Sequence, residues 1–121
     1  MTCLDTTFLA DLLRKNPDAE RKLSDFVKEN TTLSTTIINS AELFYGAYRS
    51  KNMPEEKQKI KQFLRKFLVL EMDERGAEKF GEILSILDRS GQKVSDRDVM
   101  IAAIAISKGE KLRCDKKQKG L

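Results

Sequence analysis

Apolar residues recur along this chain with two spacings, which predict where helices and strands form. Apolar side chains every three or four positions indicate amphipathic helices, whereas short β-branched or apolar runs between turn residues indicate strands. The first pattern predicts six helices, over residues 6–15, 18–29, 37–49, 55–67, 73–90 and 95–108. The second predicts four strands, over residues 2–5, 33–36, 68–70 and 111–114.

The alternation of strands and helices predicts an α/β fold. We expect a small parallel sheet of about four strands with helices on both faces. The length of 121 residues fits a single domain over residues 1–121. Residues 50–54 are predicted to form a loop, and Gly109 is predicted to stop the last helix at its C′ position.

Two features of the composition narrow the possible chemistry. The chain has no histidine, which excludes Ser-His and Cys-His nucleophile pairs and His-zinc sites. Its two cysteines, Cys3 and Cys114, lie too far apart for a Cys-x-x-Cys metal knuckle. Any catalysis must therefore use carboxylates, lysines, hydroxyls or a hard metal ion held by oxygen.

The expected location is the cytoplasm. The longest purely apolar run is far below the ~18 residues that span a bilayer, and the N-terminus has neither the basic region nor the apolar stretch of a signal peptide. The net charge of +4 permits a polyanionic partner, although a solvated basic surface is the simpler explanation.

Two acids occupy positions that are unusual for a solvated carboxylate. Asp5 directly follows the first strand, and ligand sites of open parallel sheets form beyond the carboxyl ends of strands. Its alternative role is the N-cap of the following helix. Glu42 lies in helix 37–49, which is apolar nearly all round, so we expect it to be buried and to need a partner, a metal ion or a proton. A structural ion pair is its alternative role.

Two more acids open helix 95–108. Residues 99–106 include no polar side chain, which predicts a central, buried helix. Ser95 and Asp98 resemble a capping box, but capping accounts less well for the pair Asp96 and Asp98. We therefore expect one of these two acids to point into a site.

Asp115 ends the last strand as Asp5 ends the first, with a turn residue as the alternative role. A doubly wound sheet can bring Asp5, Glu42, Asp98 and Asp115 to one rim. Clustered carboxylates repel one another, and a divalent cation relieves that repulsion. Oxygen ligands without His or Cys favour Mg²⁺ or Mn²⁺ over zinc. Such a cluster supports metal-assisted attack of water on a phosphodiester.

Three motifs resemble those of PIN-domain ribonucleases, of the kind that serve as VapC toxins in toxin–antitoxin pairs. Residues 4–9, Leu-Asp-Thr-Thr-Phe-Leu, resemble the opening strand of the family and the helix after it. Residues 39–46 resemble its Asn-x-x-Glu-Leu-x-x-Gly helix, and residues 98–103 resemble its Asp-Leu-Leu-Ile-Ala-Ala helix start. All three occur in the order that the family has.

The resemblance implies a metal-dependent endoribonuclease that hydrolyses RNA phosphodiesters with Mg²⁺ or Mn²⁺. Asp5, Glu42 and Asp98 match the first three acids of the family, and Asp115 matches the fourth. These four are the expected catalytic residues and metal ligands. As secondary candidates, Asp96 stands where some members carry an additional acid, and Thr6 matches a hydroxyl residue that helps to hold the metal or its water.

The chain departs from the family near its end. The family usually has Leu-Val-Thr before its fourth acid and a Phe shortly after it, whereas residues 111–114 here are Lys-Leu-Arg-Cys and residues 116–118 are Lys-Lys-Gln. We expect the short last strand of many members to be missing. Residues 116–121 are expected to form a mobile basic tail that attracts RNA.

The resemblance also implies a small antitoxin protein as a partner, and a homodimer. The first two helices and the helix that carries Phe44, Tyr45 and Tyr48 have more apolar positions than one small sheet needs, which indicates an interface. The alternative is that these side chains complete the core of the monomer.

Two other functions fit the same residues. The first is a catalytically silent PIN-domain protein that only binds a partner, which metal-dependent RNA cleavage would distinguish. The second is a receiver-like or other phosphate-handling α/β domain. A receiver usually has paired acids after its first strand and a lysine after its last, where this chain has Asp5 alone and Asp115.

Overall fold

A four-stranded parallel sheet forms the centre of the molecule. The computed structural model describes residues 2–29, 31–109 and 111–113. The strands lie in the order β3-β2-β1-β4, with all neighbours parallel. Their bounds are β1 Thr2–Leu4, β2 Leu33–Thr36, β3 Leu68–Leu70 and β4 Lys111–Arg113. The helices are α1 Thr6–Leu13, α2 Pro17–Lys28, α3 Ile37–Tyr48, α4 Met53–Leu64, α5 Glu74–Arg89 and α6 Asp96–Ser107. The predicted α/β fold is confirmed.

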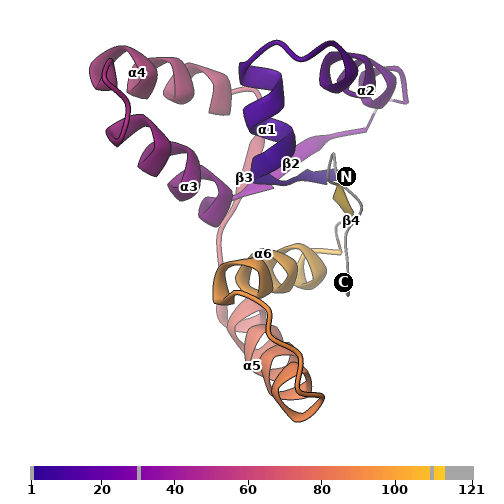
Figure 1. The fold of residues 1–121 in the computed structure, drawn as a ribbon. Helices are drawn as coiled ribbons and strands as arrows, with labels where there is room; N and C mark the ends of the chain where they lie inside the picture. The colour runs from indigo at the N-terminus through magenta and orange to yellow at the C-terminus, as the bar shows by residue number, and fades with distance from the viewer. Residues whose placement is uncertain (1, 30, 110, 114–121) are drawn as a thin grey trace.

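The helices cover both faces of the sheet. Figure 1 shows α1 to α4 on one side of the strands and α5 and α6 on the other. The two faces have separate apolar clusters, because consecutive strand residues point to opposite sides. Leu4 packs with Phe8 and Leu9 of α1, whereas its neighbour Cys3 packs with Ile104 of α6.

The strand order reverses at β1. The chain runs outward from β1 to β2 and β3, and β4 then pairs with the free side of β1. In open parallel sheets, ligand sites form at such a switch point, beyond the carboxyl ends of the strands. Asp5, the residue after β1, stands at this position, as the sequence predicted.

Strand β2 is unusual because its polar residues are fully buried. Ser34, Thr35 and Thr36 have no exposed surface. The backbone of β1 satisfies two of their hydroxyls: Thr35 Oγ1 donates to the Leu4 carbonyl at 2.7 Å, and Ser34 Oγ donates to the Thr2 carbonyl at 3.1 Å. These bonds hold β2 against β1, and α3 begins directly after β2, at Ile37.

Helix α6 is central, as predicted. Val99 and residues 101–105 are buried, whereas Ile106 is half-exposed. The helix ends at the expected place because Gly109 has a φ of +73°, a backbone conformation that glycine adopts without strain. Lys108 is its C-cap.

The prediction for α4 was wrong at both ends. The helix includes Met53 and Pro54, which were expected in a loop, because proline fits the first helical turn, where its missing N–H has no partner to lose. It ends at Leu64, three residues early. Beyond it, the Lys66 and Phe67 amides donate to carbonyls three residues back, which makes a tight turn.

No helix within the residues that the structure describes is both long enough and apolar enough to cross a membrane.

Candidate active site

Asp5 is the first polar group beyond β1, and it caps α1. Its Oδ1 accepts a hydrogen bond from the Phe8 amide at 3.0 Å. The capping role considered for this residue is therefore present. The side chain is half-buried, and its Oδ2 has no hydrogen bond or ion pair with a described residue. One oxygen thus holds the helix start, and the other remains open to a ligand.

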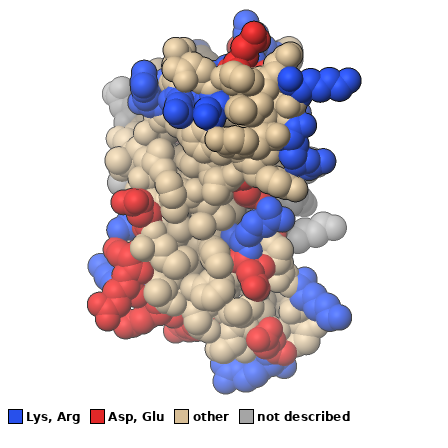
Figure 2. Space-filling view, turned by 90° about the vertical axis from the view of Figure 1, so that its left-hand side faces the viewer, with Lys and Arg blue, Asp and Glu red and all other residues tan. Residues whose placement is uncertain are grey.

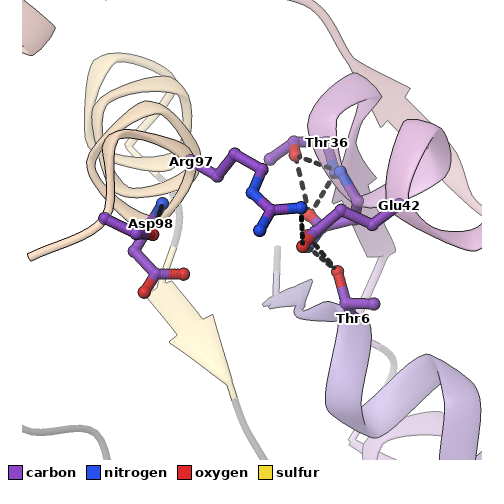
Figure 3. A network of polar contacts seen from close by, with 7 residues as sticks. Thr6, Thr36, Glu42, Arg97 and Asp98 are labelled. Atoms are coloured by element: carbon purple, nitrogen blue, oxygen red, sulfur yellow. Dashed lines mark hydrogen bonds and ion pairs between the residues drawn. The ribbon is translucent and has the colours of Figure 1, made fainter. Parts of the chain in front are cut away.

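Thr6 connects Asp5 to the second acid. Its hydroxyl donates to Glu42 Oε1 at 2.6 Å and accepts from Asn39 Nδ2 at 2.9 Å (Figure 3). A threonine hydroxyl carries one hydrogen. Because Asn39 donates to this oxygen, the hydrogen of Thr6 is directed to Glu42. The result is a hydrogen-bond chain of fixed direction, from Asn39 through Thr6 to Glu42.

Asn39 is fully buried and held by the start of α3. Its Oδ1 accepts from the Thr36 amide at 3.1 Å and from Thr36 Oγ1 at 2.7 Å, and its own amide donates to Thr36 Oγ1 at 3.1 Å. This is a capping box in which asparagine replaces the usual glutamate. The sequence analysis included Asn39 in a family motif but assigned it no structural role, although the spacing Thr36-x-x-Asn39 could have identified the capping box.

Glu42 is only partly buried, so the expectation of a buried side chain was wrong. Its side chain is 25% exposed, and Tyr45 and Tyr48 on the same helix are largely exposed. The neighbouring elements cover only one side of α3, on which Asn39, Ser40, Leu43 and Ala47 are buried. The other side stays exposed, although it also carries apolar residues. The alternative role, an ion pair, is observed: Glu42 Oε2 lies 3.5 Å from Arg97 Nη1.

Asp96 and Asp98 lie on the exposed first turn of α6. Ser95 caps this helix by accepting from the Asp98 amide at 3.1 Å, as the capping alternative proposed. The residue of this turn that reaches Glu42 is Arg97, which stands between the two acids. In Figure 3 the Asp98 carboxylate makes no contact with Glu42 or Thr6. Sequence reasoning missed Arg97, because a lone arginine between two aspartates carries no distinctive signal.

The donor set of the site suits a hard cation. Asp5, Thr6 and Glu42 offer oxygen at one edge of the sheet, and a cation, Arg97, already lies beside Glu42. Within residues 2–29, 31–109 and 111–113, no three acidic or cysteine side chains are close enough together to hold a metal ion. Asp115 and the tail 116–121 lie outside the described residues. The four-acid rim therefore stays a prediction.

A groove of about 460 Å³ runs from this site between α1, α3 and α4. Thr6 and Glu42 line it, and so do two cations, Arg14 and Lys59. Figure 2 shows further basic side chains gathered at the end of the molecule that α4 forms. The groove thus carries two cations and two acids, Glu42 at the site and Glu56 on α4.

The fold and the site together define a class: a small parallel α/β domain with carboxylate and hydroxyl oxygens beyond the carboxyl end of its first strand. The sequence profile of the PIN domain matches residues 2–120. The chain belongs to the PIN domain family, as the resemblance of its three motifs predicted.

Two relatives are similar to almost the whole chain. Ribonuclease VapC2 from Rickettsia felis is 27% identical over 109 residues, which are 90% of this chain and 81% of that protein. Ribonuclease VapC2 from Haemophilus influenzae is 30% identical over 106 residues, which are 88% of this chain and 79% of that protein.

Solved structures give the same family. The crystal structure of VapBC2 from Rickettsia felis bound to a promoter DNA fragment has a chain with a TM-score of 0.82 and 25% identity. The match covers 92% of this chain and 84% of that one. VapBC-1 from nontypeable Haemophilus influenzae matches with a TM-score of 0.82 and 25% identity, over 92% and 83% of the two chains.

Proposed function

We propose that this protein is a metal-dependent endoribonuclease, the toxin of a VapBC-type toxin–antitoxin pair. The observation that carries the proposal is the contact between Thr6 and Glu42 directly beside Asp5, at the switch point of the sheet. Relatives that bear the name ribonuclease VapC2 support the reaction, because the alignment with them spans most of both chains.

The proposed ligands of one Mg²⁺ or Mn²⁺ are Asp5, Glu42 and Asp98, with Asp115 as the fourth acid and Thr6 and Asp96 as secondary candidates. When bound, such a cation activates water for attack on phosphorus and offsets negative charge on the phosphoryl oxygens. The capping bond from the Phe8 amide holds the Asp5 carboxylate in one orientation. Thr6 holds Glu42 in the same way, because its hydroxyl donates to Glu42 Oε1, and Asn39 orients that hydroxyl by donating to its oxygen.

Arg14 and Lys59 are proposed to hold the RNA backbone. Both line the groove that begins at Thr6 and Glu42, so they can contact phosphates on one side of the cleaved bond. Contacts of this kind are sequence-independent and weaken as salt rises. We therefore expect cleavage at low substrate concentration to fall with ionic strength.

The test is RNA cleavage with purified protein in Mg²⁺, Mn²⁺ or EDTA. We expect cleavage only with metal, and a loss of at least ~100-fold in Glu42→Gln and in Asp98→Asn, because each substitution removes a charged ligand. Glu82→Gln is a matched control, since Glu82 pairs with Lys79 on the surface of α5. Cleavage in EDTA, or full activity of Asp98→Asn, would contradict the proposed ligand set. No cleavage by the parent protein would favour the silent binding protein.

The proposed partner is a small antitoxin protein. The similar solved structures from Rickettsia felis and Haemophilus influenzae are of VapBC2 and VapBC-1, which supports a partner of this kind. The test is to co-express the chain with the product of an adjacent short gene. We expect the two proteins to copurify, and RNA cleavage to be suppressed in the complex.

A homodimer is proposed as well. Phe44 packs against the core, but several large apolar side chains are 41–60% exposed: Val27, Ile37, Tyr45, Tyr48, Leu68, Ile86 and Ile106. Tyr45 and Tyr48 lie three residues apart on α3, so they share one exposed face of that helix, which supports an interface there. Sedimentation at tens of micromolar tests the proposal, with a dimer expected. A monomer at that concentration would show that these side chains remain on a free surface.

A further inference from the structure

Arg97 is the feature of the site that the proposed reaction does not yet use. It projects from the first turn of α6 toward α3 and pairs with Glu42, a proposed metal ligand. Its flanking residues, Asp96 and Asp98, are exposed acids on the same turn. The Arg97 guanidinium thus lies beside the carboxylate that is proposed to bind the divalent cation.

Both carboxylate oxygens of Glu42 are engaged. Oε1 accepts the short bond from Thr6 at 2.6 Å, and Oε2 faces Arg97 Nη1 at 3.5 Å. The first contact is partly buried and continues to buried Asn39, whereas the Arg97 side chain is 63% exposed. A metal ion would therefore replace the partner of Oε2, which is Arg97, more easily than the partner of Oε1, which is Thr6.

We propose that Arg97 is an internal counter-ion of the metal site, which neutralises Glu42 in the metal-free protein and is displaced from it when the divalent cation binds. The inference rests on the proposed function, because it takes Glu42 as a ligand of the metal. It assigns Arg97 as a positioning residue: it keeps the Glu42 carboxylate directed across the site before metal arrives, and it lowers the apparent affinity of the site.

The expected effect is moderate. A half-exposed ion pair changes an equilibrium by about 1.4- to 5-fold, and the loss of repulsion between a guanidinium and a divalent cation adds to this. We expect Arg97→Gln to bind Mn²⁺ about 3- to 10-fold more tightly than the parent. Arg97→Lys should lie between the two, since lysine keeps the charge but presents a smaller, more strongly hydrated head.

The experiment measures Mn²⁺ binding by electron paramagnetic resonance of the free ion, with no RNA present. Arg75→Gln is the matched control, because it removes the same charge far from Glu42. Arg75 belongs to α5 and lines a pocket with Ile106 and Ser107, at the opposite end of α6 from Arg97. A second readout follows the guanidinium signals of arginine-labelled protein by NMR while Mg²⁺ is added. One signal should shift, and Arg97→Gln should lack that signal.

The outcomes separate this inference from the proposed function. Tighter Mn²⁺ binding by Arg97→Gln but not by Arg75→Gln supports the displaced counter-ion. Equal Mn²⁺ affinity of Arg97→Gln and the parent overturns the role of Arg97 and leaves the ribonuclease proposal intact. Weaker binding by Arg97→Gln also overturns it, because Arg97 would then help the metal to bind. No Mn²⁺ binding by any of the proteins overturns both.

Discussion

Asp5 and Asp73 begin their helices in the same way but have different surroundings. Each follows a strand of the sheet and caps the next helix through Oδ1, which accepts from the Phe8 amide at 3.0 Å and from the Gly76 amide at 2.9 Å. The second oxygen of Asp73 is paired with Lys108 at 2.8 Å. The second oxygen of Asp5 has no such partner among the described residues.

The difference follows from where the two strands lie. β3 is at the edge of the sheet, and Asp73 joins the start of α5 to the end of α6. β1 is in the middle, next to the reversal of strand order. Side-chain hydrogen bonding from Lys108, with the Gly76 amide, lowers the pKa of Asp73. A structural acid is thus fully paired, and the acid at the switch point keeps one oxygen available.

The largest expected effect is on RNA cleavage. Asp5→Asn should lower the cleavage rate at least ~100-fold, because asparagine keeps the cap but loses the charge that a metal ligand needs. Asp73→Asn makes the same change at the other cap and should leave the rate within about twofold. Both rates are measured in Mg²⁺ with folding checked by circular dichroism. Equal losses in the two variants would remove the functional distinction between these acids.

The largest expected effect on stability concerns the hydrogen bonds of Asn39 with Thr36 and Thr6. Asn39→Ala removes the acceptor for the Thr36 amide and hydroxyl in the interior, and we expect a loss of about 2 kcal/mol in the free energy of unfolding. Asn16→Ala removes an asparagine that caps α2 through the Ala19 amide, and should cost about 1 kcal/mol. Urea titrations of both variants test this. A smaller loss in Asn39→Ala than in Asn16→Ala would mean that water replaces the network.

Added metal should also distinguish Asp5 from Asp73 in the absence of RNA, through its effect on the melting temperature. At a concentration ten times the dissociation constant, Mn²⁺ should stabilise the parent by about 1.4 kcal/mol, since it binds the folded state. Asp73→Asn should show the same rise in melting temperature, and Asp5→Asn should show almost none. A rise that persists in Asp5→Asn would place the cation elsewhere.

The smallest effect concerns acid pH at Asp73. Its folded-state pKa is lowered, so its contribution to stability is complete above the unfolded-state pKa and is lost as the pH falls through the folded-state pKa. The parent should therefore be more stable than Asp73→Asn near neutral pH, and the two should converge in acid. Lys108→Gln should narrow the gap at neutral pH. Melting curves from neutral to acid pH test this, and a gap that does not change with pH would contradict it.

The sequence by itself determined the α/β class, most element positions and the place of Asp5. Period and alternation depend on local geometry, so they identify a strand such as Leu33–Thr36 or a helix such as α6 without knowledge of what lies nearby. Among the element bounds, α4 was predicted wrongly at both ends: Met53 and Pro54 were assigned to a loop although proline fits a first helical turn, and the helix ends at Leu64.

Only the tertiary structure decided how the site is connected. Hydropathy predicted that Glu42 is buried, yet its exposure depends on which side of α3 the rest of the protein covers. The pairing of Glu42 with Arg97 joins residues 55 positions apart, and the bond from Thr6 to Glu42 spans 36. Such contacts depend on how helices pack across the sheet, and no periodicity within one element records that packing.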